Sequence, residues 1–130
     1  MLKIKKEIYE EMITYCQQGM PYEVCGILAG QDNCVTEIFK IKNIENSSVS
    51  YLMDPLEQLK VMKEIRSKTL QFLAIFHSHP FGSAYPSQKD KELAFYDVYY
   101  IIVALLPKIE VKCFKIKNNE FFEEEIQVEV

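Results

Sequence analysis

The spacing of apolar residues along the chain predicts alternating helices and short strands. An amphipathic helix near the start is predicted from four apolar residues on one helical face: Ile8, Met12, Tyr15 and Cys16. Pro21 ends this segment. Two apolar, β-branched runs follow at residues 24–29 and 35–41, and the Gly-, Asp- and Asn-containing residues 30–33 between them are typical of a hairpin turn. Residues 43–50 are polar and are predicted to form a loop.

A second helix is predicted to begin at Asp54. The Asp54 side chain can cap it, Pro55 suits the first helical position, and Glu57 can reach back to the cap. Its apolar stripe, which drifts around the helix to about Lys68, consists of Leu56, Leu59, Val61, Met62 and Ile65.

The second half of the chain is predicted to be richer in strands. Residues 72–76 form a buried strand that runs into His77-Ser78-His79-Pro80, and residues 81–86 form a loop. Ser87 opens a short helix that reaches about Tyr96. Three further strands are predicted at residues 99–105, 111–117 and 121–130. The order α-β-β-α-β-α-β-β-β predicts one α+β domain over residues 1–130, with helices packed on a mixed, largely antiparallel sheet.

Composition narrows the class of protein. A hydrophobic fraction of 48% argues against disorder, and a net charge of -4 offers no basic surface to nucleic acid or anionic lipid. The longest apolar run, residues 99–107, is strand-sized rather than membrane-spanning, and it predicts either core or the edge of a homodimer. The charged N-terminus lacks the pattern of a signal peptide, so we expect a cytoplasmic protein. The four scattered cysteines are then predicted to be mostly buried thiols.

The only two histidines in the chain stand in the sequence His77-Ser78-His79. On an extended strand, residues two apart point to the same face, so the two imidazoles converge as a metal ion requires. Zinc takes imidazole nitrogen readily, and a catalytic zinc uses three protein ligands. A bare His-x-His pair is also explained by chance or by the polar needs of a strand end.

Asp90 and Glu23 are the acidic residues that complete this hypothesis. A carboxylate in the first turn of a helix can swing back to a metal at the preceding strand end, although Ser87 and Asp90 also have the spacing of a helix-capping box. The two interpretations are compatible, because Ser87 can cap while Asp90 turns to the metal. Glu23 precedes a strand and is either a candidate base or an ordinary solvated acid.

Taken together, these residues resemble the signature of the JAMM (MPN+) zinc metallopeptidase family. The signature combines a glutamate on an early strand, His-Ser/Thr-His-Pro, a serine and an aspartate. In this chain these are Glu23, His77-Ser78-His79-Pro80, Ser87 and Asp90, without departure in type or spacing. Residues 23–30 and 51–55 are similar to the family as well, and the resemblance extends from the first helix to about Val111. It implies the JAMM/MPN (cytidine deaminase-like) fold.

The resemblance also implies a role for each signature residue. His77, His79 and Asp90 become the ligands of one zinc ion per chain, with water in the fourth position. Glu23 becomes the general base, and Ser87 becomes the donor that stabilises the oxyanion. Ser78 is expected to point away from the metal and to have a supporting role.

Family members hydrolyse the peptide or isopeptide bond after the C-terminal Gly-Gly of ubiquitin-like β-grasp proteins, and the short prokaryotic members process sulfur carriers. We therefore expect a sulfur-carrier substrate, with a deubiquitinase-like isopeptidase acting on ubiquitin-like conjugates as the alternative. Phe81, Gly82 and Tyr85 either line the channel for the tail or belong to a loop that packs its own aromatics. A non-catalytic MPN scaffold is disfavoured because all metal ligands are present, and a DNA-repair relative is disfavoured by the lack of basic charge.

Overall fold

A computed structural model describes the whole chain, residues 1–130. It contains three helices: α1 (Lys6–Gln18), α2 (Pro55–Ser67) and α3 (Gln88–Glu92). Its strands are β1 (Leu2–Lys5), β2 (Cys25–Gln31), β3 (Cys34–Ile41), β4 (Gln71–Phe81), β5 (Tyr99–Leu106), β6 (Glu110–Lys117), β7 (Glu120–Glu124) and β8 (Ile126–Glu129).

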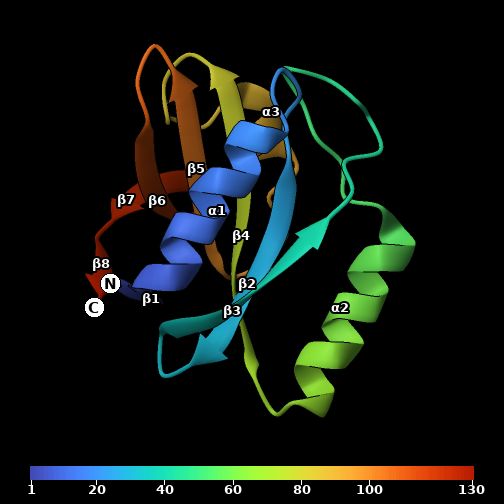
Figure 1. Cartoon of the computed structure of the whole chain (residues 1–130), viewed down its shortest axis with the longest axis vertical. Helices are drawn as coiled ribbons and strands as arrows, with labels where there is room; N and C mark the ends of the chain where they lie inside the picture. Colours follow the sequence, from blue (N-terminus) through green and yellow to red (C-terminus); the bar gives the residue numbers. More distant parts are fainter.

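All eight strands form one sheet in the order β7-β6-β5-β4-β2-β3-β1-β8. Four neighbouring pairs are antiparallel and three are parallel, so the predicted mixed, mainly antiparallel sheet is observed. The strands β7 and β8, which are separated only by Glu125, stand at opposite ends of this order. The sheet must therefore curl, and β7 and β8 do lie near each other in Figure 1.

The two faces of the sheet carry separate cores. Met12 and Cys16 of α1 pack with Leu28 on one face, and Ile65 of α2 packs with Ile27 on the other. Adjacent strand residues point to opposite faces, which explains why neighbours in β2 join different cores. In Figure 1, α1 crosses in front of the sheet and α2 lies along its side.

The predicted hairpin is confirmed as β2 and β3. Its turn residues Asp32 and Asn33 have φ angles of 53° and 58°. Two consecutive positive φ angles are the geometry that two-residue hairpins favour, and Asp and Asn tolerate it better than most residues.

Several predicted boundaries are wrong. The strand β1 was not expected, and it is held by parallel pairing with β8 and β3. The third helix ends at Glu92 rather than near Tyr96, and the last predicted strand is divided at Glu125. The two strand differences depend on long-range pairing, which local spacing does not reveal.

The second helix begins as predicted but differs in two details. Asp54 caps it by accepting hydrogen bonds from the N–H groups of Leu56 and Glu57, at 2.9 and 3.4 Å. Glu57 does not reach back to the cap, because its carboxylate accepts from the N–H of Lys42 at 2.9 Å. Part of the apolar stripe faces outward, since Leu56 is 72% and Leu59 52% exposed.

The strand β5 and three of the four cysteine thiols are buried in the core. Residues 99–105 of β5 are buried between β4 and β6, so this run is core and not the edge of a dimer. Cys16, Cys25 and Cys113 are buried and Cys34 is half-buried, all as free thiols. Burial raises the pKa of each of the three buried thiols to about 12.

None of the three helices is long and apolar enough to span a bilayer.

Candidate active site

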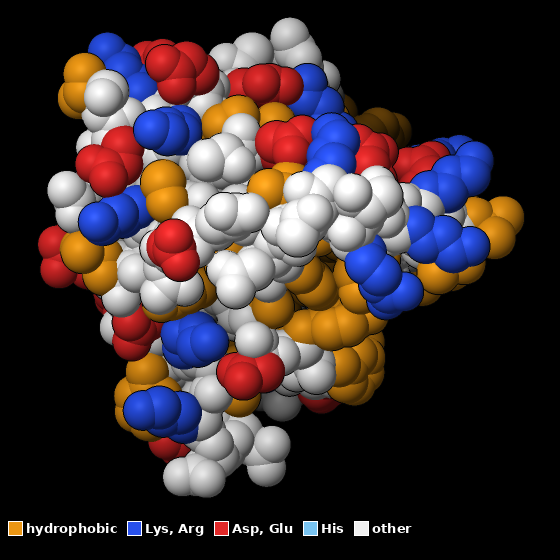
Figure 2. Space-filling model, turned by 90° about the horizontal axis from the view of Figure 1, so that it is seen from below, with side chains coloured by type: hydrophobic (Ala, Val, Ile, Leu, Met, Phe, Trp, Pro, Cys, Tyr) orange, Lys and Arg blue, Asp and Glu red, His pale blue; other side chains and the backbone are white.

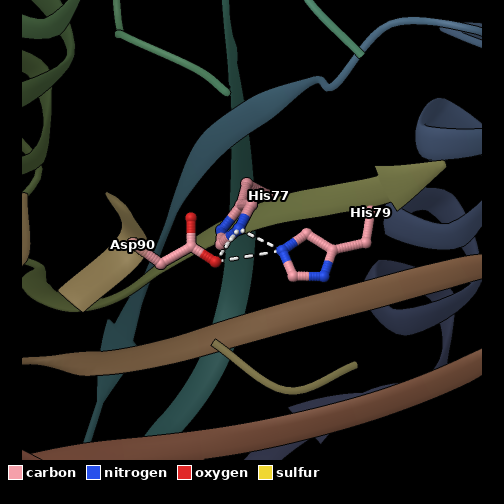
Figure 3. Close-up of side chains that lie close together, drawn as sticks. All are labelled: His77, His79 and Asp90. Carbon is pink, nitrogen blue, oxygen red and sulfur yellow. Dashed lines mark hydrogen bonds and ion pairs between the residues drawn. The ribbon is translucent and has the colours of Figure 1, made fainter. Parts of the chain in front are cut away.

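His77, His79 and Asp90 meet at one point above the end of β4 (Figure 3). The Nε2 atoms of the two histidines are 3.2 Å apart. The Oδ2 atom of Asp90 lies 3.2 Å from Nε2 of His77 and 3.0 Å from Nε2 of His79. Three potential ligand atoms therefore form a nearly equilateral triangle.

The strand β4 brings the two histidines to the same face, as predicted. It extends through the whole His-Ser-His-Pro segment and ends at Phe81. Ser78, between them in the sequence, bonds to Val24 just before β2. Its Oγ accepts a hydrogen bond from the Val24 N–H at 2.9 Å, and its own N–H donates to the Val24 carbonyl at 2.9 Å. Ser78 thus ties the histidine-bearing strand to the segment that carries Glu23.

Asp90 belongs to a helix cap and to the histidine cluster at once. The Ser87 hydroxyl oxygen accepts from the Asp90 N–H at 3.1 Å, and the Ser87 N–H donates to Asp90 Oδ2 at 2.9 Å. The same Oδ2 atom faces His77 and His79. The capping interpretation of the Ser-x-x-Asp spacing is confirmed, and the cap holds the carboxylate where it faces both histidines, as the metal-ligand interpretation requires.

Neighbouring groups set the orientation of the two imidazole rings. The Nδ1 atom of His79 is 2.8 Å from the Ser83 carbonyl, which can only accept a hydrogen bond, so Nδ1 carries the proton and Nε2 presents a lone pair. The His77 ring stacks on Tyr51, with 4.4 Å between centroids and 25° between planes. The Nδ1 atom of His77 is buried without a hydrogen-bond partner.

The spacing of the three ligand atoms fits a tetrahedral zinc ion. Zinc binds imidazole nitrogen and carboxylate oxygen at about 2.0–2.1 Å, which places tetrahedral ligand atoms about 3.3 Å apart. The observed separations of 3.0–3.2 Å are close to this value. The ligand types, His, His and Asp, are those of a zinc site that leaves one position free.

The pKa shifts leave His77 neutral and Asp90 ionised, which suits a metal ion, whereas His79 protonates more readily than usual and its proton would compete with the metal. Burial lowers the pKa of His77, which keeps its ring neutral. Burial alone would also lower the pKa of His79 and raise that of Asp90. The hydrogen bonds between them outweigh burial, so the pKa of His79 is raised and that of Asp90 is held well below its usual range. Asp90 is therefore ionised at neutral pH.

Glu23 stands two residues before β2 and is almost completely buried, at 3% exposure. It is not the ordinary solvated acid that its sequence position also allowed. Its Oε1 atom has no hydrogen-bond partner, and burial raises the pKa of the carboxyl to about 8. His79 and Asp90 are close enough for their charges to act on this pKa, the first lowering it and the second raising it.

The raised pKa predicts how Glu23 affects the stability of the metal-free protein. The unfolded chain ionises this carboxyl near the ordinary glutamate pKa of 4.5 and the folded chain only near 8, so stability is lost as pH rises between these values. Glu23→Gln should therefore stabilise the metal-free protein by about 2–4 kcal/mol more at pH 9 than at pH 4. Urea unfolding of both proteins in chelator measures this, and parallel pH profiles would contradict it.

An apolar pocket of about 200 Å³ opens beside the cluster. It is lined by Tyr51, Leu52, Met53, Gln58, Ile75, Leu93, Phe95 and Tyr96. On the α2 side of the molecule, Figure 2 shows apolar side chains gathered in a recess with Lys and Arg side chains at its rim. Phe81 and Tyr85 do not line this pocket, and Tyr85 instead lies against Phe114, with ring centroids 6.1 Å apart.

Three residues near the site were not identified from the sequence. Tyr51 stacks on His77, the Ser83 carbonyl orients His79, and Asn43 holds the main chain at Glu23. Tyr51 lies in one of the family-like segments, which was the only signal. Ser83 acts through its backbone, and Asn43 lies in a polar stretch that gave no sign of burial.

Sequence comparison matches residues 5–117 to the family described as prokaryotic homologs of the JAB domain. A CysO-cysteine peptidase of Mycobacterium tuberculosis (strain ATCC 25618 / H37Rv) is 29% identical over 133 residues, covering 98% of this chain and 91% of that protein. A probable TtuB-protein conjugate cleaving protease of Thermus thermophilus is 35% identical over 103 residues, covering 78% of this chain and 69% of that protein.

Solved structures agree with this relationship. A protein from Desulfitobacterium hafniense superimposes with a TM-score of 0.89 at 36% identity, covering 99% of this chain and 93% of that one. A JAB1/MPN domain protein from Archaeoglobus fulgidus superimposes with a TM-score of 0.65 at 21% identity, covering 98% of both chains, and shares the fold. The chain belongs to the prokaryotic JAB family, as predicted. It has the JAMM/MPN fold and is a hydrolase of the peptidase class.

Proposed function

We propose that this chain, as a single domain with one zinc ion, hydrolyses the bond after the C-terminal Gly-Gly of a β-grasp sulfur-carrier protein. The observation that carries the proposal is the triangle of His77, His79 and Asp90, with its three ligand atoms 3.0–3.2 Å apart. We assign these residues as the zinc ligands. Such a site argues against a non-catalytic scaffold, which has no need of a metal-ligand triangle.

The residues around the triangle supply the other parts of a hydrolytic site. Zinc held there would activate a water molecule and polarise the scissile carbonyl. We assign Glu23 as the base that accepts the proton of the attacking water and passes it to the leaving amine. The Ser87 oxygen already accepts from the Asp90 N–H, which leaves its hydroxyl proton free to donate to the carbonyl oxygen as negative charge develops.

An extended glycine tail suits the segment beside the histidines. Leu52 and Asp54 direct their backbone hydrogen bonds to Ile44 and Lys42, at 3.0 and 2.9 Å. The alternating residues, Tyr51 and Met53, therefore direct theirs to the opposite edge, where a peptide can add as a strand. Glycine lacks the Cβ atom that would keep a passing backbone away from the metal.

The names of the relatives support a carrier substrate and also a protein conjugate as a second candidate substrate. One relative is named as a peptidase of CysO-cysteine, and the match covers nearly the whole of this chain. The Thermus relative is named for cleavage of protein conjugates. We therefore keep an isopeptidase acting on ubiquitin-like conjugates as the alternative function.

Intact-mass spectrometry distinguishes these substrates. The zinc-loaded chain is incubated with a β-grasp carrier ending in Gly-Gly-Cys, with the same carrier joined through Gly-Gly to a lysine side chain, and with a Gly-Ala-Cys control. The proposal predicts release of cysteine from the first carrier and no cleavage of the control. Preferential cleavage of the lysine conjugate would favour the alternative, and no cleavage of either Gly-Gly substrate would contradict both.

Ser87→Ala tests the role of the hydroxyl proton. Turnover should fall by about 10²–10³-fold because a donor to the developing oxyanion is lost, while zinc content stays unchanged. The substitution also removes a helix cap worth about 1 kcal/mol, so Ser87→Thr is the matched control that keeps both the hydroxyl and the cap. Equal activity of the Ala and Thr variants would show that the hydroxyl takes no part in the reaction.

A further inference from the structure

The side chain of Asn43 makes the largest possible number of hydrogen bonds while almost buried, at 9% exposure. Its amide nitrogen donates to the carbonyls of Glu23 and Ser50, at 3.0 and 3.2 Å. Its amide oxygen accepts from the N–H groups of Glu45 and Leu52, both at 3.0 Å. A side-chain amide has two donor hydrogens and two acceptor lone pairs, and all four are used.

The main chain at Glu23 is held by hydrogen bonds on both sides, one of them from Asn43. The Glu23 N–H donates to the Ser47 carbonyl at 2.8 Å, so both polar backbone groups of Glu23 are held by the 43–50 segment. The next residue, Val24, is tied in both directions to Ser78, between the two histidines. The backbone at Glu23 is therefore fixed between the histidine-bearing strand and the loop that Asn43 organises.

No hydrogen bond holds the Glu23 carboxylate, and its buried Oε1 atom has no partner. Its direction therefore depends on the packing around the side chain and on the main chain that carries it. We propose that Asn43 is a positioning residue that aims Glu23 at the reacting water by anchoring the Glu23 carbonyl. This inference rests on the proposed function, specifically on Glu23 as the base.

The same amide also places the ring that covers His77. Leu52 donates to Asn43 and stands next to Tyr51, whose ring stacks on His77 at 4.4 Å. Asn43 thus connects the segment that carries the base with the segment that flanks a metal ligand. A displacement of about 1 Å at a catalytic group costs about 10²-fold in rate, which sets the scale of the expected effect.

A double-mutant cycle with Glu23→Gln tests the inference on the zinc-loaded protein, using release of cysteine from the Gly-Gly-Cys carrier. Asn43→Ala should lower kcat by about 10- to 100-fold with KM and zinc content close to wild type. In the Glu23→Gln background the same change should lower kcat by less than about twofold, because no base is left to position.

Ser50→Ala is the matched control. It removes a hydrogen bond to Glu45 from the same loop without touching Glu23, and it should leave kcat within about threefold of wild type.

The outcomes separate this inference from the assignment on which it depends. An equal loss of kcat in both backgrounds, or loss of zinc from Asn43→Ala, would overturn the positioning role of Asn43 and leave Glu23 as the base. Near-normal turnover of Glu23→Gln alone would overturn the assignment of the base, and the inference with it. If Asn43→Ala does not fold, Asn43→Ser, whose shorter side chain cannot span to Glu23, replaces it in the cycle with the same expected values.

Discussion

Glu23→Gln is expected to bind zinc as the wild type does and to lose about 10²–10⁴-fold in turnover. The amide keeps the size of the side chain, but it cannot accept the proton of the attacking water. The residue is 3% exposed and lies close enough to His79 and Asp90 for their charges to act on it. The carrier-cleavage assay measures turnover, and elemental analysis of the same preparations measures zinc content.

The matched control for Glu23→Gln is Glu45→Gln. Glu45 is another acid whose charge acts on Glu23, but it lies on the surface and pairs with Ser50 and Lys89 at 2.6 and 3.1 Å. Its replacement should change turnover by less than about threefold, as expected for exposed charges. Retention of near-normal turnover by Glu23→Gln would show that another group accepts the proton.

Asp90→Asn is expected to weaken zinc binding by at least about 10²-fold and to abolish turnover at limiting zinc. A neutral amide oxygen is a poorer zinc ligand than the carboxylate oxygen that now faces both histidines at 3.0–3.2 Å. The amide can still accept from the Ser87 N–H, so the helix cap is retained and the loss reports on the metal. Competitive titration with a chromophoric zinc chelator measures the affinity.

Asp97→Asn serves as the control for the change of charge. Asp97 is almost fully exposed, and its only ion pair is with Lys115 at 3.4 Å, so its replacement should leave zinc affinity unchanged. Zinc binding by Asp90→Asn as tight as that of the wild type would remove Asp90 from the ligand set. Asp90 would then serve only as the capping-box partner of Ser87 at the start of α3.

Local patterns predicted the parts of the molecule that depend on neighbouring residues. The turn at Asp32 and Asn33, the cap at Asp54 and the shared face of His77 and His79 all follow from spacing within a few residues. The convergence of Asp90 on the histidines is also found, since a short helix follows β4 closely along the chain. The proposed role of Glu23 came from the family resemblance, because its sequence position alone favoured a solvated acid.

Features that arise from distant segments could not be predicted in the same way. The strand β1 is held by pairing with β3 and with β8, the latter more than a hundred residues further along the chain. The backbone of the buried Glu23 is held by Asn43 and Ser47, in a loop some twenty residues further along. The outward position of Leu56 in α2 is equally invisible in a helical stripe, because the sheet covers only part of the helix surface.

Elemental analysis of the untagged wild-type protein tests the central claim most directly. The protein is prepared without chelator, dialysed against zinc and then against metal-free buffer, and analysed beside Asp90→Asn at the same concentration. We predict one zinc per wild-type chain and a clear deficit in the variant. A wild-type chain that retains no zinc and takes up none on titration would contradict the assignment of a zinc peptidase.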